Sequence, residues 1–175
     1  MNKHLRRAGV IVAMALTGIL AVVGGASAVS AFFAGSTTSV QRDITETNAT
    51  LVSTAAGWHD VPSTALGGIV VPAGTTRVVE STFGAESLCN ATSWCSVRVV
   101  AVNSAGGVIE FNPVVGTDYA FDSPGGSWEQ HSLHRVTRLG AGTYTIKVQA
   151  TLVGPAAGAQ FRLDDYTHFV DVVNP

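Results

Sequence analysis

The side chains that could bind a metal or transfer a proton are four histidines and a few carboxylates, all located after residue 28. His131 and His134 form an H-x-x-H pair within Trp128-Glu-Gln-His-Ser-Leu-His-Arg135. On a helix this spacing would bring both rings to one metal ion, but on a strand positions three apart point to opposite faces. We therefore expect no shared ion without a bulge. Glu129 and His131 do share a strand face, and their polar row is typical of a face exposed to solvent.

Asp164 and Asp165 interrupt an otherwise apolar alternation in Phe161-Arg-Leu-Asp-Asp-Tyr-Thr-His-Phe169. Neighbouring strand positions face opposite ways, so one carboxylate must point toward the core unless a bulge resets the register. Three interpretations stay open. One aspartate ties down a neighbouring loop, the pair binds calcium together with backbone carbonyls, or one of them does acid–base work with Glu86 or Glu129. Apart from that calcium ion, the sequence predicts no cofactor.

Flat aromatic side chains with polar neighbours suit the apolar faces of sugars. Trp58-His59-Asp60 has this composition, and Trp94, Trp128, Tyr119 and Tyr166 are further candidates. The alternative is that at least two of the three tryptophans pack in the core or against a hairpin. The residues predicted to contact a ligand are Trp58, His59, Trp128, His131 and Tyr166.

Sequence motifs that would mark an enzyme are missing. The chain contains no Gly-x-Ser-x-Gly elbow, no H-E-x-x-H, no phosphate-binding loop and no dinucleotide fingerprint. We therefore predict a protein without catalytic activity, and name no catalytic residue.

Both cysteines, Cys89 and Cys95, lie in Leu88-Cys-Asn-Ala-Thr-Ser-Trp-Cys-Ser96. Two cysteines in an exported domain form a disulfide more often than a metal site, and no histidine lies close to them in sequence. Closing this short loop stabilises the fold by roughly 2.4 kcal/mol in the chain-entropy model. The predicted disulfide therefore braces a local turn and does not hold the whole fold together.

The first segment has the layout of a secretory signal peptide. Lys3, Arg6 and Arg7 precede an apolar stretch over 8–23, and the small residues Ala26-Ser-Ala28 suit cleavage. The alternative is an uncut N-terminal anchor, since residues 8–35 as a helix could span a bilayer. Either way the sequence predicts a secreted or cell-surface protein. The expected divisions are a signal peptide over 1–28, a flexible lead-in over 29–43 and one domain over 44–175.

The charge balance argues against two classes of partner. Without Lys3, Arg6 and Arg7, the 10 basic residues of the chain fall to 7, against 12 acidic ones, for a net charge of −5. Nucleic acids and anionic lipid surfaces attract basic proteins, so neither is an expected partner. Beyond a possible N-terminal anchor we expect no membrane contact. Apolar residues at 46% and charged residues at 13% also exclude intrinsic disorder.

Beyond residue 40 the hydrophobic pattern alternates with a period of two. In 143–152 every second residue is apolar and the residues between them are polar, which predicts a half-buried strand. Glycine- and proline-rich turns separate such runs, and no long helical pattern appears. The sequence thus predicts an all-β antiparallel sandwich or jelly roll of about eight to ten strands. We expect two long hairpins, one between 127–138 and 143–153 and one between 143–153 and 160–172. The expected strands are 44–53, 58–61, 68–71, 76–84, 95–103, 108–112, 118–122, 127–138, 143–153 and 160–172.

The chain resembles a group of secreted actinobacterial proteins of unknown function over about residues 44–172. The motifs that carry the resemblance are Phe83-Gly-Ala-Glu-Ser87, Trp94-Cys-Ser-Val-Arg98, Tyr119-Ala-Phe-Asp-Ser123, Trp128-Glu-Gln-His-Ser132, Gly142-Thr-Tyr-Thr-Ile-Lys-Val-Gln149 and Phe161-Arg-Leu-Asp-Asp165. This resemblance implies location and fold, and no activity. At the level of fold the pattern is also similar to tumour-necrosis-factor-like and carbohydrate-binding jelly rolls, but a fold does not fix a function.

Three functions follow as hypotheses. The first is an extracellular binding module without catalytic activity, for a glycan or a surface protein. The second is a structural protein that self-associates through flat sheet faces into trimers, as tumour-necrosis-factor-like jelly rolls do. The third is a small secreted hydrolase that uses the region of Asp164, Asp165 and His168.

Overall fold

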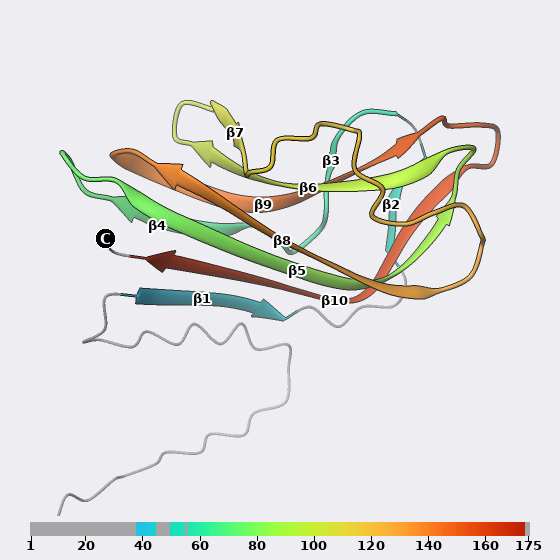
Figure 1. Ribbon diagram of the computed structural model, residues 1–175, viewed down its shortest axis with the longest axis horizontal. Helices are drawn as coiled ribbons and strands as arrows, with labels where there is room; N and C mark the ends of the chain where they lie inside the picture. Colours follow the sequence, from blue (N-terminus) through green and yellow to red (C-terminus); the bar gives the residue numbers. More distant parts are fainter. Residues whose placement is uncertain (1–37, 45–49, 55, 174–175) are drawn as a thin grey trace, which may run out of the picture.

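The computed structural model describes residues 38–44, 50–54 and 56–173, and all the regular elements in these ranges are strands (Figure 1). This confirms the all-β fold. The strands are β1 (Thr38–Ile44), β2 (Thr50–Ser53), β3 (His59–Asp60), β4 (Leu66–Val71), β5 (Arg77–Asn90), β6 (Trp94–Asn103), β7 (Val108–Glu110), β8 (Glu129–Leu139), β9 (Gly142–Val153) and β10 (Gln160–Val173).

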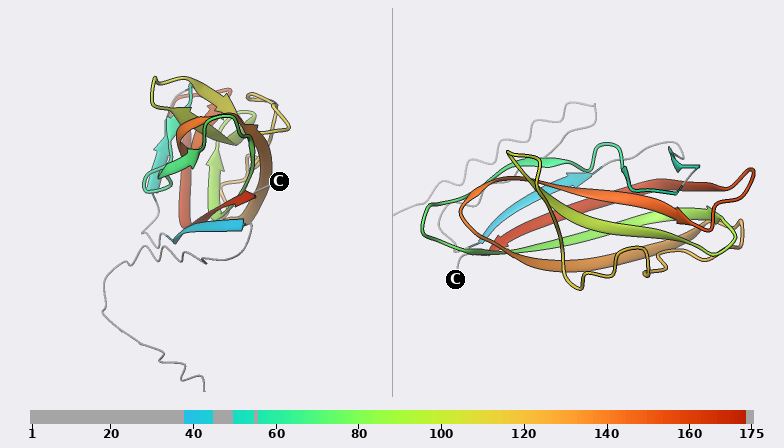
Figure 2. Two further views of the ribbon diagram at one scale, coloured as in Figure 1. Left: turned by 90° about the vertical axis from the view of Figure 1, so that its left-hand side faces the viewer. Right: turned by 90° about the horizontal axis from the view of Figure 1, so that it is seen from above.

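The strands form two antiparallel sheets that pack face to face (Figure 2). One sheet, here called the β5–β10 sheet, has the order β1-β10-β5-β8, with β2 also paired to β10. The other, the β6–β9 sheet, has the order β3-β9-β6-β7, with β4 also paired to β9. The molecule is therefore a β-sandwich, as the sequence predicts.

Alternation along each strand decides which side chains fill the space between the sheets. In β9 the apolar residues of one parity, from Tyr144 to Leu152, are buried, while Thr143 on the other face is exposed. In β5 the buried parity carries Val79, Phe83 and Ala85. Burying the apolar face of each sheet against the other removes both from water, and this is the main stabilising contribution in a sandwich.

The two predicted hairpins are wrong. β8 pairs with β5 while β9 pairs with β6, so the turn Leu139-Gly-Ala-Gly142 carries the chain from one sheet to the other. The connection from β9 to β10 crosses back in the same way. Among the described strands, β6 and β7 are the only consecutive pair that hydrogen-bond to each other. A half-buried strand shows the same alternation whether its neighbour lies beside it or across the core, so the pattern could not separate these arrangements.

Two strand boundaries and one expected strand also differ from expectation. β1 begins at Thr38, inside the segment 29–43 expected to be a flexible lead-in, because its backbone adds to the edge of β10. β5 continues to Asn90, six residues past its expected end, since β10 pairs with it along this whole length. Residues 118–122 form no strand, and only an isolated bridge joins Asp122 to Cys95.

The structure contains a bulge in the last strand, the predicted alternative to an inward-pointing aspartate. The register between β10 and β5 shifts between Asp164 and Thr167, and Asp165 has a positive φ of 44°. Leu163 and Tyr166, three positions apart, are therefore both buried. The bulge keeps both aspartates out of the core and lets the apolar pattern resume in register.

The predicted signal peptide over 1–28 lies outside the described residues. Within the part of the chain that the structure describes, no helix is long and apolar enough to cross a membrane.

Candidate functional site

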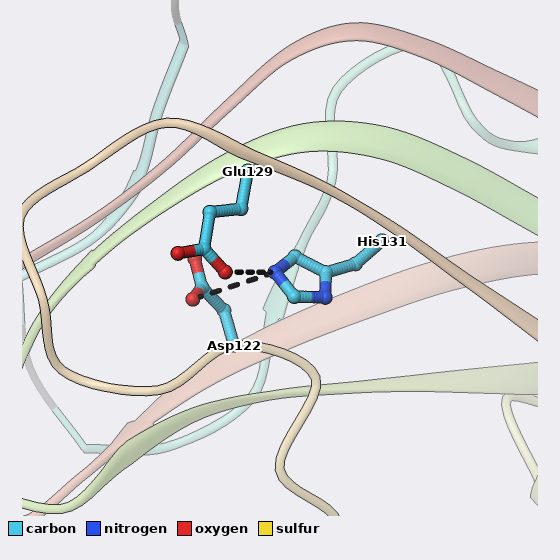
Figure 3. Close-up of side chains that lie close together, drawn as sticks. All are labelled: Asp122, Glu129 and His131. Carbon is cyan, nitrogen blue, oxygen red and sulfur yellow. Dashed lines mark ion pairs between the residues drawn. The ribbon is translucent and has the colours of Figure 1, made fainter.

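Three metal-ligating side chains meet at one end of the sandwich: Asp122, Glu129 and His131 (Figure 3). His131 Nε2 lies 3.5 Å from a Glu129 carboxylate oxygen and 3.6 Å from Asp122 Oδ1. One ligand atom from each residue falls within 4.8 Å of the other two. In the described residues this is the only such group of three or more His, Cys, Asp and Glu side chains.

The geometry of β8 places two of the three residues. Glu129 and His131 have the same parity as Leu133, which is buried between the sheets, so both lie on the core side of β8. Their shared face was predicted from the sequence. At this end of the strand the core side is polar, and Glu129 is 59% exposed while His131 is 28% exposed.

The third residue comes from the loop between β7 and β8. Asp122 is 3% exposed, and Ser87 of β5 donates a hydrogen bond of 2.8 Å to its Oδ2. The Phe121 ring packs against the His131 imidazole at 5.5 Å between centroids. The loop therefore closes over the core side of β8, and this row is less open to solvent than the sequence suggested.

The predicted disulfide between Cys89 and Cys95 is confirmed, and it joins the end of β5 to the start of β6. Both cysteines also hold the loop that carries Asp122. Cys95 N–H donates to Asp122 C=O at 2.9 Å, and Cys95 C=O accepts from Phe121 N–H at 2.9 Å. Cys89 C=O accepts from the N–H groups of Gly125 and Gly126 at 3.4 Å. The end of β5, the start of β6 and the loop that carries Asp122 thus meet at this disulfide.

The H-x-x-H pair does not converge on one point, as expected for a strand. His134 faces the opposite way from His131 and lies 3.6 Å from a Glu80 carboxylate oxygen on the outer face of the β5–β10 sheet. Only one of the two histidines therefore belongs to the cluster.

The structure places Asp164 and Asp165 away from this cluster. Asp164 lies opposite Glu86 on β5, and Glu86 lies opposite Gln130 on β8, so the three form a row on the outer face of the β5–β10 sheet. Asp164 Oδ1 accepts the N–H of Asp165 at 3.0 Å, a local tie of the kind that the first interpretation describes. No third His, Cys, Asp or Glu of the described chain gathers with these two aspartates.

The predicted aromatic ligands are scattered. Trp58 lies under the guanidinium of Arg98, which is 4.2 Å from the ring centroid, on the outer face of the β6–β9 sheet. The neighbouring His59 is exposed on β3. Tyr166 is 1% exposed and donates its hydroxyl to Pro62 C=O at 3.0 Å, so its ring is a core side chain.

Trp128 is the predicted aromatic that remains accessible. It is 41% exposed and directly precedes β8, a strand of the β5–β10 sheet, whereas Trp58 contacts the β6–β9 sheet. The two tryptophans therefore do not line one cleft.

His168, named for a hydrolase, lies inside the sandwich at 1% exposed. Its Nδ1 lies 2.8 Å from Thr64 C=O and its Nε2 lies 2.9 Å from Ser81 Oγ. Burial lowers the pKa of His168 to about 4, although the Thr64 carbonyl acts in the opposite direction. A neutral, doubly hydrogen-bonded ring with almost no access to solvent is a structural residue, not a proton carrier.

Asp122 is the site residue that sequence reasoning missed. It belongs to Tyr119-Ala-Phe-Asp-Ser123, and no motif connects it with Glu129 and His131. A weak signal was present. An aspartate that directly follows an apolar residue in a predicted strand indicates that its carboxylate needs a polar or charged partner. The answer depends on a loop whose path the sequence does not show.

Comparison with known proteins adds little to this geometry. No protein-family model matches the chain, and no curated protein matches its sequence. Among solved structures, the chain is similar to the CBM22-1 xylan-binding domain from Paenibacillus barcinonensis, at 13% identity over 78% of this chain and 83% of that one. The TM-score of this match is 0.32, a weak similarity.

Proposed function

We propose that this protein is an exported binding module without catalytic activity that holds a glycan on the outer face of the β5–β10 sheet, beside Trp128. The observation that carries the proposal is the 41% exposure of this tryptophan at the end of a polar sheet face. A half-exposed indole ring offers a flat apolar surface with a polar edge, and a pyranose ring stacks well on such a surface.

Hydrogen-bonding groups follow Trp128 along the outer face of β8 and continue onto β5. Gln130 and Ser132 alternate outward along β8, and Glu86 lies opposite Gln130 on β5, with all three side chains exposed. Asp164 extends this row onto β10. Amide, hydroxyl and carboxylate groups next to one aromatic ring match the alternation of hydroxyls and apolar faces on a sugar.

Two further features support the wider setting of the proposal. The Cys89–Cys95 disulfide fits an oxidising compartment such as the outside of a cell. The resemblance to secreted actinobacterial proteins and the predicted signal peptide agree with export. The exposed positions that follow Trp128 on the outer face carry the polar side chains of Glu86, Gln130 and Ser132, which favours a small polar ligand over the apolar packing of a trimer.

The proposal is tested by affinity gel electrophoresis against soluble xylans, β-glucans, mannans and peptidoglycan fragments. We expect at least one polymer to retard the wild-type protein, and Trp128→Ala to remove this retardation with folding intact. The matched control is Trp58→Ala, because the Trp58 ring already stacks on Arg98 and should leave binding unchanged. If no glycan retards the protein, or if Trp128→Ala binds as well as wild type, the proposal is wrong.

Light scattering on the same sample tests the alternative of a self-associating structural protein. We expect a monomer, because the outer faces of the two sheets carry charged groups such as Glu86 and Lys147. A stable trimer whose assembly survives Trp128→Ala would instead favour the structural role.

A further inference from the structure

We infer that Asp122, Glu129 and His131 form a binding site for a divalent transition metal of the zinc class. The site lies on the core side of β8, whereas the proposed glycan surface lies on its outer face, so this inference does not depend on the proposed function. It rests on ligand spacing, on the burial of one carboxylate and on an unpaired ring nitrogen.

The spacing of the cluster is too wide for hydrogen bonds and suits a shared ion. A histidine that donates to a carboxylate closes to about 2.7–2.9 Å. Here His131 Nε2 is 3.5 Å and 3.6 Å from the two carboxylate oxygens. In a zinc tetrahedron with bonds of about 2.1 Å, the distance between two ligand atoms is about 3.4 Å. The observed separations are therefore close to the edges of such a tetrahedron.

The ring nitrogen at the centre of the cluster has no hydrogen-bond partner among the described residues. This atom, His131 Nε2, is buried, although part of the imidazole ring is exposed. Figure 3 shows this nitrogen facing both carboxylates. A buried nitrogen without a partner is unfavourable, and coordination through its lone pair would satisfy it.

The buried carboxylate needs a positive charge nearby. Asp122 is 3% exposed, and among the described residues its carboxylate accepts a hydrogen bond only from the neutral hydroxyl of Ser87. In the described residues its only ion-pair partner within 4.0 Å is His131, which carries a charge only when protonated. A divalent cation would compensate the carboxylates of Asp122 and Glu129 and leave His131 neutral.

The surroundings hold the ligands in place. Ser87 occupies Oδ2 of Asp122 and leaves Oδ1 directed at His131. The backbone of Asp122 is bridged to Cys95, next to the disulfide, and Phe121 packs on the imidazole ring. Supporting contacts of this kind orient the metal-ligating side chains and raise the affinity for the metal.

The donor set selects the class of metal. One imidazole nitrogen with two carboxylates suits zinc and its neighbours in the first transition row, whereas calcium and magnesium prefer oxygen ligands alone. Three protein ligands leave the fourth tetrahedral position for water or for a donor from a bound molecule. Glu129 is 59% exposed, so solvent reaches at least this ligand of the cluster.

The test is calorimetric titration of the chelator-treated, disulfide-intact protein with zinc chloride, alongside the visible absorption of its cobalt(II) complex. We expect one equivalent of zinc to bind and the cobalt complex to show intense tetrahedral bands. Calcium chloride should not compete. His131→Ala should abolish binding, and Glu129→Gln, at an exposed strand end, should weaken it at least about tenfold without affecting folding.

The matched control is His134→Ala. His134 lies on the outer face of β8, 3.6 Å from a carboxylate oxygen of Glu80 on β5, and no second carboxylate of the described residues lies within 4.0 Å of it, so its loss should leave zinc affinity unchanged. The inference is overturned if zinc does not bind at one equivalent. It is equally overturned if binding survives both Glu129→Gln and His131→Ala, since the metal would then lie elsewhere.

Discussion

Protonation of His168 should make the stability of this protein fall in mild acid. The ring is buried between the sheets, and burial lowers its pKa to about 4, against an ordinary value of 6.5 in the unfolded chain. Between these two values the unfolded chain binds a proton that the folded chain does not. The free energy of unfolding is therefore fully retained above pH 6.5 and is lost as the pH falls from 6.5 toward 4.

The size of this effect follows from the two pKa values. Each unit of difference corresponds to about 1.4 kcal/mol, so the full loss below pH 4 is about 3.4 kcal/mol. At pH 5 most unfolded chains carry the proton on this histidine and few folded ones do, and the loss is about 2 kcal/mol. For a domain with a total stability of roughly 5–15 kcal/mol, this is a large fraction.

The assay is urea denaturation followed by tryptophan fluorescence at several pH values between 8 and 5. His168→Asn keeps a donor for the Thr64 carbonyl but has no ionisable ring, so this variant is the control. It should be less stable than wild type at pH 8 and should lose about 2 kcal/mol less on acidification. Equal pH dependence in both proteins, or an imidazole NMR signal of His168 that titrates near pH 6.5, would refute the reasoning.

Three other changes test separate parts of the fold. Replacing Cys89 and Cys95 together by serine should lower the free energy of unfolding by about 2.4 kcal/mol in chemical denaturation and should also weaken zinc binding, because the disulfide fixes the two backbone segments that hydrogen-bond to the Asp122 loop. Asp165→Gly should be neutral or stabilising by up to about 1 kcal/mol, since glycine adopts a positive φ freely; a clear loss of stability would contradict this account of the bulge. Trp58→Ala should lower the melting temperature with a loss of about 1 kcal/mol, because the stacked guanidinium on the β6–β9 sheet loses its partner, and an unchanged melting curve would show that the contact is not stabilising.

The alternation of side chains predicted burial well and strand pairing poorly. Val148 and Ile146 are fully buried, as their parity in the sequence indicates. The same signal led to hairpins that do not exist, because a strand with one apolar face needs a covering layer and does not specify its hydrogen-bonding neighbour. Pairing depends on the path of the connections, and the tight turn Leu139-Gly-Ala-Gly142 serves a crossing between sheets here.

Local chemistry in the sequence was a good guide where the interacting residues are close along the chain. The disulfide between Cys89 and Cys95 and the shared face of Glu129 and His131 are both local facts of this kind. The fates of Trp58 and Tyr166 could not be predicted, because they depend on partners far away in sequence, Arg98 and Pro62. For the same reason, the sequence did not predict that Asp122 lies beside Glu129 and His131.

The period of two that defines a strand also separates the two proposed sites on β8. Odd-numbered positions such as Glu129 and His131 face the core side and the loop that carries Asp122. Even-numbered positions such as Gln130 and Ser132 face outward, on the proposed glycan surface. A change on one face therefore need not disturb the other. Trp128→Ala should leave zinc binding intact, and Glu129→Gln should leave glycan binding intact. If either variant removes both activities while the protein stays folded, the two faces are not independent, and the assignment of separate sites to the two sides of this strand fails.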